Sequence, residues 1–229
     1  MTVSIPPSAC VMIIGAAKSG TTSLFHLLRQ HPAICPSRTK EPEYFSDRTR
    51  TAPSYRYDDL YEFDPGVHRL CLEASTDYTK FPEHMDVPQR IKEYGLEPFF
   101  IYAVRNPLER VESQYNYLHH HPDLHIHAEG SMLNPRAIHA SMYFLQLREF
   151  LRYFPDKSRY RIVDFRDIVS VPETTVDGLL TWLGLEAHSV DTDVWKNRTR
   201  PPTTLEAAIS RLPTEIRRLA PASSRLRRV

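Results

Sequence analysis

A strand–loop–helix pattern near the amino terminus constrains the fold more than any other stretch. The apolar run CVMIIGAA starts at residue 10, and the helix-like segment GTTSLFHLLRQHP follows it and stops at Pro32. A short continuous apolar run that ends at glycine is typical of a buried strand in a parallel sheet. Gly15 and Gly20 stand five positions apart, as in loops that hold phosphate groups. We therefore expect an anion-binding loop between this strand and this helix.

The rest of the chain alternates between strands and helices. Further strands are expected over 68–75, 98–107 and 159–168. This alternation predicts an α/β fold, a three-layer α/β/α sandwich around a mainly parallel sheet of the P-loop NTPase-like kind, with residues 1–229 as a single domain. In such sheets ligands bind at the carboxyl ends of the strands, which is where the anion-binding loop lies.

The expected helices carry apolar residues at helical spacing. Asn106 is placed to cap one helix, and Pro107 suits its first turn. Another helix is expected to open with a capping box, Ser170 and Glu173, and to end at Gly184. The expected apolar faces are Leu24, Leu27 and Leu28 in the first helix, Leu108, Val111, Tyr115 and Leu118 in the helix after Pro107, and Ala140, Phe144, Leu147 and Leu151 in a helix over 136–153, with a last helix over 203–211.

Composition sets broad limits. With 41% hydrophobic and 25% charged residues, the chain of 229 residues has enough apolar side chains for a packed core. Its three cysteines, Cys10, Cys35 and Cys71, have the spacing of neither a disulfide framework nor a zinc motif, as is usual in a reducing compartment. No apolar stretch approaches the roughly 20 residues of a membrane span, and no signal peptide is recognisable. We expect a cytoplasmic protein without a membrane span.

The positive charge is carried mainly by arginine, with 23 Arg against 6 Lys, although the net charge is only +1. Arginine favours forked contacts to phosphate, sulfate and carboxylate groups, so the bias fits a protein that binds anions. A GC-rich genome explains the same bias equally well. We expect no nucleic-acid partner, since the basic end RLRRV is best interpreted as a solvated tail.

The lysine of the loop is out of place for a loop that binds ATP. In a Walker A loop, lysine directly follows the second glycine, where this chain has Thr21, and Lys18 comes two residues before Gly20. Backbone N–H groups and the helix dipole still favour an anion. The expected contacts to it come from Ala17, Lys18, Ser19, Gly20, Thr21, Thr22 and Ser23. We expect no metal ion here, because no acidic strand end suggests a magnesium site.

A second motif lies at the end of the strand over 98–107. In YAVRNPLERVESQY, Arg105 leaves the strand end and Ser113 follows eight residues later, two turns into the next helix. Arg105 can fork onto a phosphate group, and Ser113 can donate its hydroxyl from the flank of the helix. Taken separately, Arg105 also fits a salt bridge and Ser113 a solvated helix position.

Together the two motifs resemble those of sulfotransferases that use 3′-phosphoadenosine 5′-phosphosulfate (PAPS). GAAKSGTTSL resembles their 5′-phosphosulfate loop, and Arg105 with Ser113 their 3′-phosphate motif. The resemblance implies PAPS as cofactor, PAP as its product, and Lys18 as the residue that stabilises the leaving phosphate. WKNRTRPP is similar to the basic loop that closes on the nucleotide, which makes Lys196 and Arg198 further candidates.

Three further segments resemble the heparan-type and related bacterial branch. RTKEPEYFSD resembles its KExxFF segment, which implies Glu41 as the catalytic base, with a partly desolvated carboxylate. Glu41 also fits a surface salt bridge with Lys40 or Arg38. LEASTDY resembles EKSPxY, with Ala74 in place of the lysine. YRIVDFRDIVSVPETTVDGLLTWLGL resembles the EDL…P…FLGL stretch, with Arg166 where glutamate is usual. Glu43 and Glu73 are the next candidates for the base.

The resemblance implies sulfuryl transfer to a hydroxyl or amine of a small-molecule or carbohydrate acceptor. The acceptor stays open among carbohydrate, lipid-like alcohol, phenol and polyketide hydroxyl, because Tyr55, Tyr57, Tyr61 and Phe63 can line a pocket or pack in the core. Two other functions remain: a P-loop kinase of a small metabolite, and a nucleotide-binding module without turnover. His119, His120, His121, His125 and His127 suggest an acceptor-facing or solvated loop, a base or a zinc site.

Overall fold

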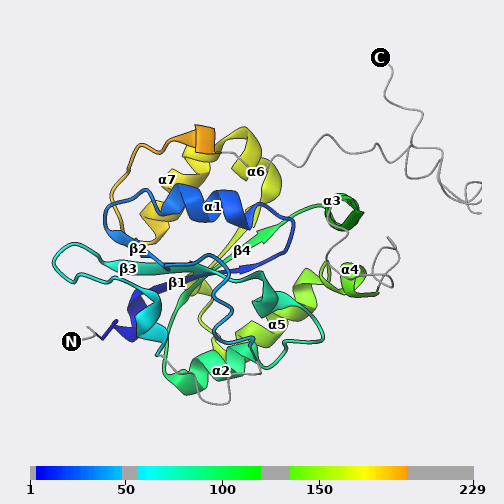
Figure 1. The fold of residues 1–229 in the computed structure, drawn as a ribbon, viewed down its shortest axis with the longest axis horizontal. Helices are drawn as coiled ribbons and strands as arrows, with labels where there is room; N and C mark the ends of the chain where they lie inside the picture. The colour runs from blue at the N-terminus through cyan, green and yellow to red at the C-terminus, as the bar shows by residue number, and fades with distance from the viewer. Residues whose placement is uncertain (1–3, 48–55, 120–134, 195–229) are drawn as a thin grey trace, which may run out of the picture.

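The computed structural model describes residues 4–47, 56–119 and 135–194, and these contain one parallel sheet (Figure 1). Its strands are β1 (Cys10–Gly15), β2 (Ile34–Pro36), β3 (Leu70–Ala74), β4 (Phe99–Val104) and β5 (Tyr160–Asp164). Their order is β2-β3-β1-β4-β5, and each neighbouring pair is parallel. Consecutive strands therefore end at one common edge, with β1 in the middle, and the loop after β1 lies between the ends of β3 and β4.

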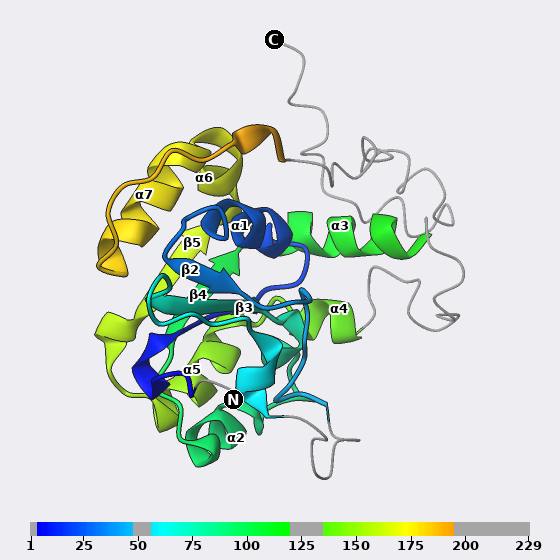
Figure 2. The same cartoon turned by 60° about the vertical axis from the view of Figure 1, so that its left-hand side comes forward.

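Helices cover both faces of the sheet, which confirms the predicted three-layer α/β/α sandwich (Figures 1 and 2). On one face lie α1 (Thr21–Leu28), α6 (Phe165–Ser170) and α7 (Pro172–Trp182), and on the other lie α2 (Val87–Tyr94) and α5 (Tyr143–Tyr153). Figure 2 shows α3 (Pro107–His119) and α4 (Pro135–His139) projecting from the carboxyl edge. Short 3₁₀ turns complete the described structure: η1 (Pro7–Ala9), η2 (Tyr57–Leu60), η3 (Thr76–Thr79), η4 (Lys157–Arg159) and η5 (Thr192–Val194).

The core lies between the sheet and its helices, and β1 is its centre. All six residues of β1 are buried, as a strand with neighbours on both sides and helices on both faces must be. On the α1 side, Leu24, Leu27 and Leu28 are buried, as predicted from their spacing. On the α5 side, the Phe100 ring packs against Phe150 with ring centroids 5.2 Å apart. This packing fixes the strand ends that carry the candidate site.

The predicted helix over 136–153 is wrong, because it is broken between α4 and α5. The break at residues 140–142 turns α5, so that Phe144 is 74% exposed while Gln146 and Phe150 are buried. The Gln146 amide donates to the His139 carbonyl across the break, at 2.9 Å. A buried glutamine side chain that holds the end of α4 thus replaces the continuous apolar stripe.

The predicted apolar stripe of α3 is also wrong at its start. Leu108 is 80% exposed, whereas Arg110 is fully buried. Arg110 Nε donates to Ser141 Oγ at 2.6 Å, and its Nη2 donates to the Ala137 carbonyl. The inner face of α3 is therefore polar, because it contacts the α4–α5 junction rather than the sheet. The predicted cap is confirmed, since Asn106 Oδ1 accepts the Leu108 N–H at 3.0 Å.

The predicted strand over 159–168 is too long, since β5 ends at Asp164. The Asp164 carboxylate accepts the Arg166 N–H at 2.8 Å and caps α6. Ser170 caps no helix: it is the last residue of α6 and its hydroxyl donates to the Arg166 carbonyl at 2.7 Å. The predicted end at Gly184 is confirmed, with a left-handed φ of 71° after α7. The helix expected over 203–211 lies outside the described residues.

Candidate functional site

The loop 15–20 joins β1 to α1 at the carboxyl edge, and close packing requires both of its glycines. At Gly15, where φ is 144°, an added Cβ would lie 2.1 Å from Thr79 Oγ1. At Gly20, where φ is 85°, it would lie 2.9 Å from Phe165 Cδ2. Only glycine fits such contacts at positive φ without strain. The loop is therefore fixed between η3 and the start of α6.

Hydrogen-bond donors gather where this loop enters α1. The first N–H groups of a helix have no intrahelical partner and attract anions. Thr21 is buried, and Thr22, Ser23 and Ala17 are half-buried. Ser19 is fully buried, and its hydroxyl has no hydrogen-bond partner among the described residues. Because buried hydroxyls are almost always hydrogen-bonded, Ser19 fits an oxygen of a ligand held by the loop.

Lys18 has its ammonium group against an aromatic ring rather than a carboxylate. Its Nζ lies 3.9 Å from the centroid of the Tyr117 ring, a cation–π contact from α3. Burial, and secondarily the nearby Arg105 guanidinium, lowers the pKa of Lys18 to about 8. Both causes disfavour a positive charge. An anion bound in the loop would therefore gain strongly from pairing with this ammonium.

Arg105 follows β4 directly and touches the loop, as the sequence suggested for a shared site. Its Nη1 donates to the Lys18 carbonyl at 3.4 Å, and its Nε lies 3.4 Å from Glu109 Oε2. Its guanidinium also lies over the Phe165 ring, 4.3 Å from the centroid. The Tyr143 hydroxyl donates to the Arg105 carbonyl at 2.8 Å. Two cations from neighbouring strand ends are thus held side by side.

Ser113 lies on the face of α3 that is turned toward these cations. Glu109, Ser113 and Tyr117 are four residues apart along the helix, so they share one face. Glu109 reaches Arg105 at one end of this row, and Tyr117 reaches Lys18 at the other. Ser113 stands between them and faces the same space.

Glu41 lies at the same edge, beside the end of β3. Its N–H donates to the Ala74 carbonyl at 2.9 Å, and its carboxylate accepts the Thr76 N–H at 2.7 Å. Lys40 forms an ion pair with the Glu41 carboxylate, and the Glu41 side chain is 30% exposed. Arg38, the other cation considered for this pair, lies 3.6 Å from Glu62 instead. The carboxylate is thus held in place, partly desolvated and still open to solvent.

Backbone strain is concentrated at this edge. Lys18, Glu41 and Glu43 have φ values of 67°, 58° and 52°, and no other non-glycine residue of the described ranges has a positive φ. The left-handed conformation costs an ordinary side chain roughly 1–3 kcal/mol and is retained mainly at functional sites. These three residues come from two loops far apart in the sequence, and both loops contribute to one candidate site.

Comparison with known proteins identifies the family. The model of the sulfotransferase family matches residues 10–189. The chain belongs to the sulfotransferase family. Mouse heparan sulfate glucosamine 3-O-sulfotransferase 6 is 28% identical to it over 201 residues, which cover 82% of this chain and 56% of that protein. Human heparan sulfate glucosamine 3-O-sulfotransferase 3B1 is 26% identical over 202 residues, covering 82% and 49%. The chain spans about half the length of these two curated relatives.

Solved structures agree on the fold of this chain. A sulfotransferase from Alicyclobacillus acidocaldarius superposes with a TM-score of 0.63 at 24% identity, covering 83% of this chain and 85% of that one. The sulfotransferase domain from the curacin biosynthetic pathway superposes with a TM-score of 0.54 at 16% identity, covering 82% and 80%. At these identities the likeness shows the fold alone.

The two other carboxylates considered as bases lie in different surroundings. Glu73 is fully buried beneath the edge and accepts hydrogen bonds from Tyr57, Ser75 and Tyr78, so it cannot contact an acceptor. Glu43 is half-buried at the edge, and burial, followed by the charge of Asp77, raises its pKa. Glu43 is therefore the alternative to Glu41, and Glu73 belongs to the core.

Three residues at the site were not singled out from the sequence: Glu109, Tyr117 and Phe165. Glu109 and Tyr117 could have been found from Ser113, since both are four residues from it on a helix. Phe165 gave no such signal, because only the pairing of β4 with β5 brings it beside Arg105.

Several expected features fall outside the described structure. Lys196, Arg198, Tyr55 and the histidines from 120 to 127 lie outside the described residues, as does the His119 side chain. Tyr57 and Tyr61 are buried, which assigns them to the core. Within 4–47, 56–119 and 135–194, no three His, Cys, Asp or Glu side chains are grouped so as to hold a metal ion. No helix in those ranges has the length and apolar character needed to cross a bilayer.

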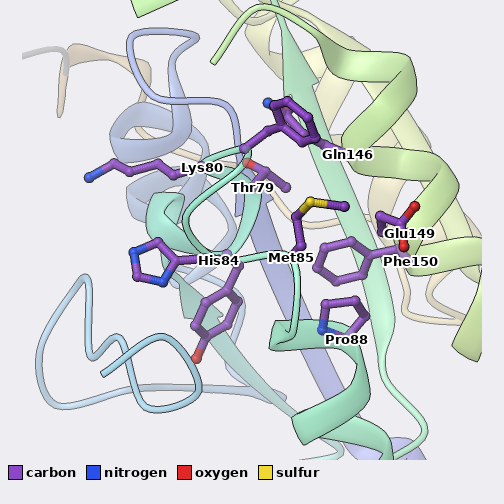
Figure 3. A pocket seen from close by; sticks show the side chains of 10 residues that line it. Thr79, Lys80, His84, Met85, Pro88, Gln146, Glu149 and Phe150 are labelled. Carbon is purple, nitrogen blue, oxygen red and sulfur yellow. The ribbon is translucent and has the colours of Figure 1, made fainter. Parts of the chain in front are cut away.

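A separate shallow hollow lies between η3, α2 and α5 (Figure 3). Figure 3 shows Met85, Pro88 and Phe150 along its apolar wall, with Lys80 pointing away from it. Neither Lys18, Arg105 nor Glu41 lines it. The hollow is therefore distinct from the candidate site at the loop.

Proposed function

We propose that the chain transfers a sulfuryl group from PAPS to a hydroxyl or amine of a small-molecule or carbohydrate acceptor. One observation carries this proposal. The lysine of a phosphate-type loop, displaced from the ATP-binding position, lies half-buried beside Arg105 of the neighbouring strand end. This arrangement suits a nucleotide with one anionic group at the loop and a second at Arg105. The family match supports the reaction class.

The residues fit PAPS in defined roles. Bound PAPS supplies a sulfuryl group joined to a phosphate, which is the leaving group. The N–H groups of residues 19–23 and the Ser19 hydroxyl hold the 5′ end. Lys18 neutralises the charge that develops on the leaving side during transfer. Arg105 and Ser113 hold the 3′-phosphate, which selects this nucleotide over ATP.

Glu41 is the proposed base, which takes the proton of the acceptor group. Its carboxylate is held by Thr76 at the edge and is 30% exposed, so an acceptor can reach it. A correctly placed base contributes about 10²–10⁴-fold to such reactions. The curated relatives are named for sulfation of heparan sulfate glucosamine. Ala74, in place of the lysine in the resembled segment, favours an acceptor less anionic than that polymer.

The donor is tested by thermal unfolding with PAP, PAPS, ADP and ATP, each with and without magnesium. A ligand at 100 times its dissociation constant stabilises the native state by about 2.7 kcal/mol, which raises the melting temperature of a chain this size by roughly 5–10 °C. We expect this shift with PAP and PAPS, independent of magnesium, and its loss in Arg105→Ala. Arg148→Ala, an arginine on α5, is the matched control. A magnesium-dependent shift with ATP alone would support the kinase instead.

The base is tested by comparing Glu41→Gln with Glu43→Gln. We expect Glu41→Gln to lower kcat about 10²-fold with little change in PAP affinity, because only proton removal is lost. Glu43→Gln is expected to change kcat by less than about threefold. The measurement is PAP released from PAPS with a panel of sugars, alcohols, phenols and amines. The opposite ranking of the two variants would assign the base to Glu43. PAP binding without transfer to any acceptor would favour the non-catalytic module.

A further inference from the structure

The carboxylate of Glu109 lies between two guanidinium groups. Arg105 Nε lies 3.4 Å from Glu109 Oε2, and Arg166 Nη2 lies 3.7 Å from Glu109 Oε1. Each carboxylate oxygen thus faces a different arginine. The three side chains form a group at the carboxyl edge. Arg105 and Glu109 lie in the second motif, whereas Arg166 comes from α6 and lies outside both motifs.

The fold itself brings the two arginines together. Val104 at the end of β4 is paired with Asp164 at the end of β5. Arg105 follows the first of these residues directly, and Arg166 is the second residue of α6. Adjacent parallel strands therefore deliver one guanidinium each to the same side of α3. The carboxylate is supplied by Glu109, from the first turn of that helix.

The start of α6 also contacts the anion-binding loop. The Phe165 ring lies under the Arg105 guanidinium, with its centroid 4.3 Å from Arg105 Cζ. The same ring is so close to Gly20 that a Cβ added to Gly20 would lie 2.9 Å from it. Arg166 is the next residue. It is therefore one residue from a side chain that touches both parts of the proposed nucleotide site.

The ion pairs of Glu109 are of the kind that a stronger anion replaces. The side chains of Arg105, Glu109 and Arg166 are 21%, 43% and 68% exposed. Ion pairs this exposed and this long contribute little to stability. A phosphate monoester carries more charge than a carboxylate and accepts forked contacts from arginine. Glu109 can turn toward water when such a group enters.

We propose that Arg166 is a second guanidinium for the 3′-phosphate of the nucleotide, and that this phosphate displaces Glu109 from between the two arginines. The inference rests on the proposed function, whose 3′-phosphate residue is Arg105. It assigns a specificity-determining role to Arg166, at a position where the resembled branch usually has glutamate. It also gives Glu109 the role of a competing internal anion. Glu112 is a further carboxylate near Arg105, and burial raises its pKa.

The test is calorimetric titration of the full chain with PAP and with AMP, which lacks the 3′-phosphate. Arg166→Gln is expected to weaken PAP binding roughly tenfold, as loss of a charge-assisted contact does, and to leave AMP binding unchanged. Glu109→Gln is expected to strengthen PAP binding about threefold or more, because the competitor is removed. Arg148→Gln on α5 and Glu93→Gln on α2 make the same changes of charge on the opposite face of the sheet.

The opposite signs of the two effects separate this role from a structural one. Damage to the fold would weaken binding in both variants, and of both nucleotides. Either an unchanged PAP affinity in Arg166→Gln or an equal loss of affinity for PAP and AMP would overturn the role of Arg166. The proposed function would still stand if Arg105→Ala abolished PAP binding. If the wild-type chain binds no PAP, the proposed function fails together with this inference. Arg166→Lys keeps the charge but not the forked contact, and it is expected to recover part of the affinity that Arg166→Gln loses.

Discussion

Replacement of Lys18 by alanine is expected to lower the rate of sulfuryl transfer by roughly 10³-fold or more. Its ammonium is half-buried, has no carboxylate partner among the described side chains and lies on the Tyr117 ring. A charge in such surroundings acts strongly on a leaving phosphate, because the low local dielectric screens it little. Arg105 also contacts the loop, through the Lys18 carbonyl, but the proposal assigns its charge to the 3′-phosphate.

The fold of the Lys18→Ala variant is expected to stay intact. Alanine at a φ of 67° has the same backbone strain as lysine, so the change adds little new strain. Melting temperature and circular dichroism check this, with Lys157→Ala on η4 as the matched control. Lys18→Arg is expected to recover part of the rate. Normal turnover in Lys18→Ala would contradict the proposed mechanism. If the melting temperature of Lys18→Ala falls strongly, Lys18→Arg becomes the deciding variant.

The same lysine predicts a pH dependence. The pKa of Lys18 is lowered to about 8 by burial and by Arg105, so the free protein loses this charge as the pH rises through about 8. Affinity for PAP is therefore expected to fall above this pH, by up to roughly tenfold per unit. Titrations from about pH 7 to about pH 9.5 measure it. The Lys18→Ala variant is expected to show a flatter profile.

The loop and Arg105 were predictable because local sequence determines them. A buried strand, a glycine at each end of the turn and a helix start leave few conformations, so the positions of Lys18 and Ser19 follow from spacing alone. Arg105 follows from its place after an apolar run. The prediction of an α/β sandwich succeeded for the same reason, since β1 and β4 are long and apolar.

The residues that sequence reasoning missed depend on tertiary contacts. The strand β2 has only three residues and forms because β3 offers it an edge. Arg110 is buried because the Ser141 hydroxyl and the Ala137 carbonyl of α4 accept its hydrogen bonds, so an apolar stripe was a poor guide there. Phe165 and Arg166 reach the site only through the pairing of β4 with β5. Periodicity cannot report such contacts, because the partners lie far away in the sequence.

The burial of Glu73 excludes it from the catalytic role that its sequence position allowed. Its position in the segment LEASTDY makes it a candidate for the catalytic base. In the structure it is fully buried and receives hydroxyl donors from Tyr57, Ser75 and Tyr78. These donors favour the charged form, but desolvation is the larger effect and raises the pKa of Glu73 from its ordinary value of 4.5 to about 7.

This raised pKa predicts that stability falls as the pH rises. Between about 4.5 and about 7 the folded chain holds a proton on Glu73 that the unfolded chain releases. The free energy of unfolding therefore contains a contribution that is complete below about pH 4.5 and is lost as the pH rises through about 7. A shift of this size corresponds to about 3 kcal/mol for a fully buried group.

Replacement of Glu73 by glutamine is expected to remove this dependence, because the amide stays neutral at every pH. Urea unfolding of both proteins between about pH 4.5 and about pH 8 gives the free energies. The free energy of unfolding of the variant is expected to rise relative to that of the wild type as the pH rises, by up to about 3 kcal/mol. Any cost of refitting the amide among the hydroxyls is the same at each pH. Since all other titrating groups are shared, the difference between the two curves isolates Glu73. Glu97→Gln, at a half-exposed glutamate, controls for the loss of charge. Parallel curves would show that Glu73 ionises normally, and its hydroxyl donors would then fully offset its burial.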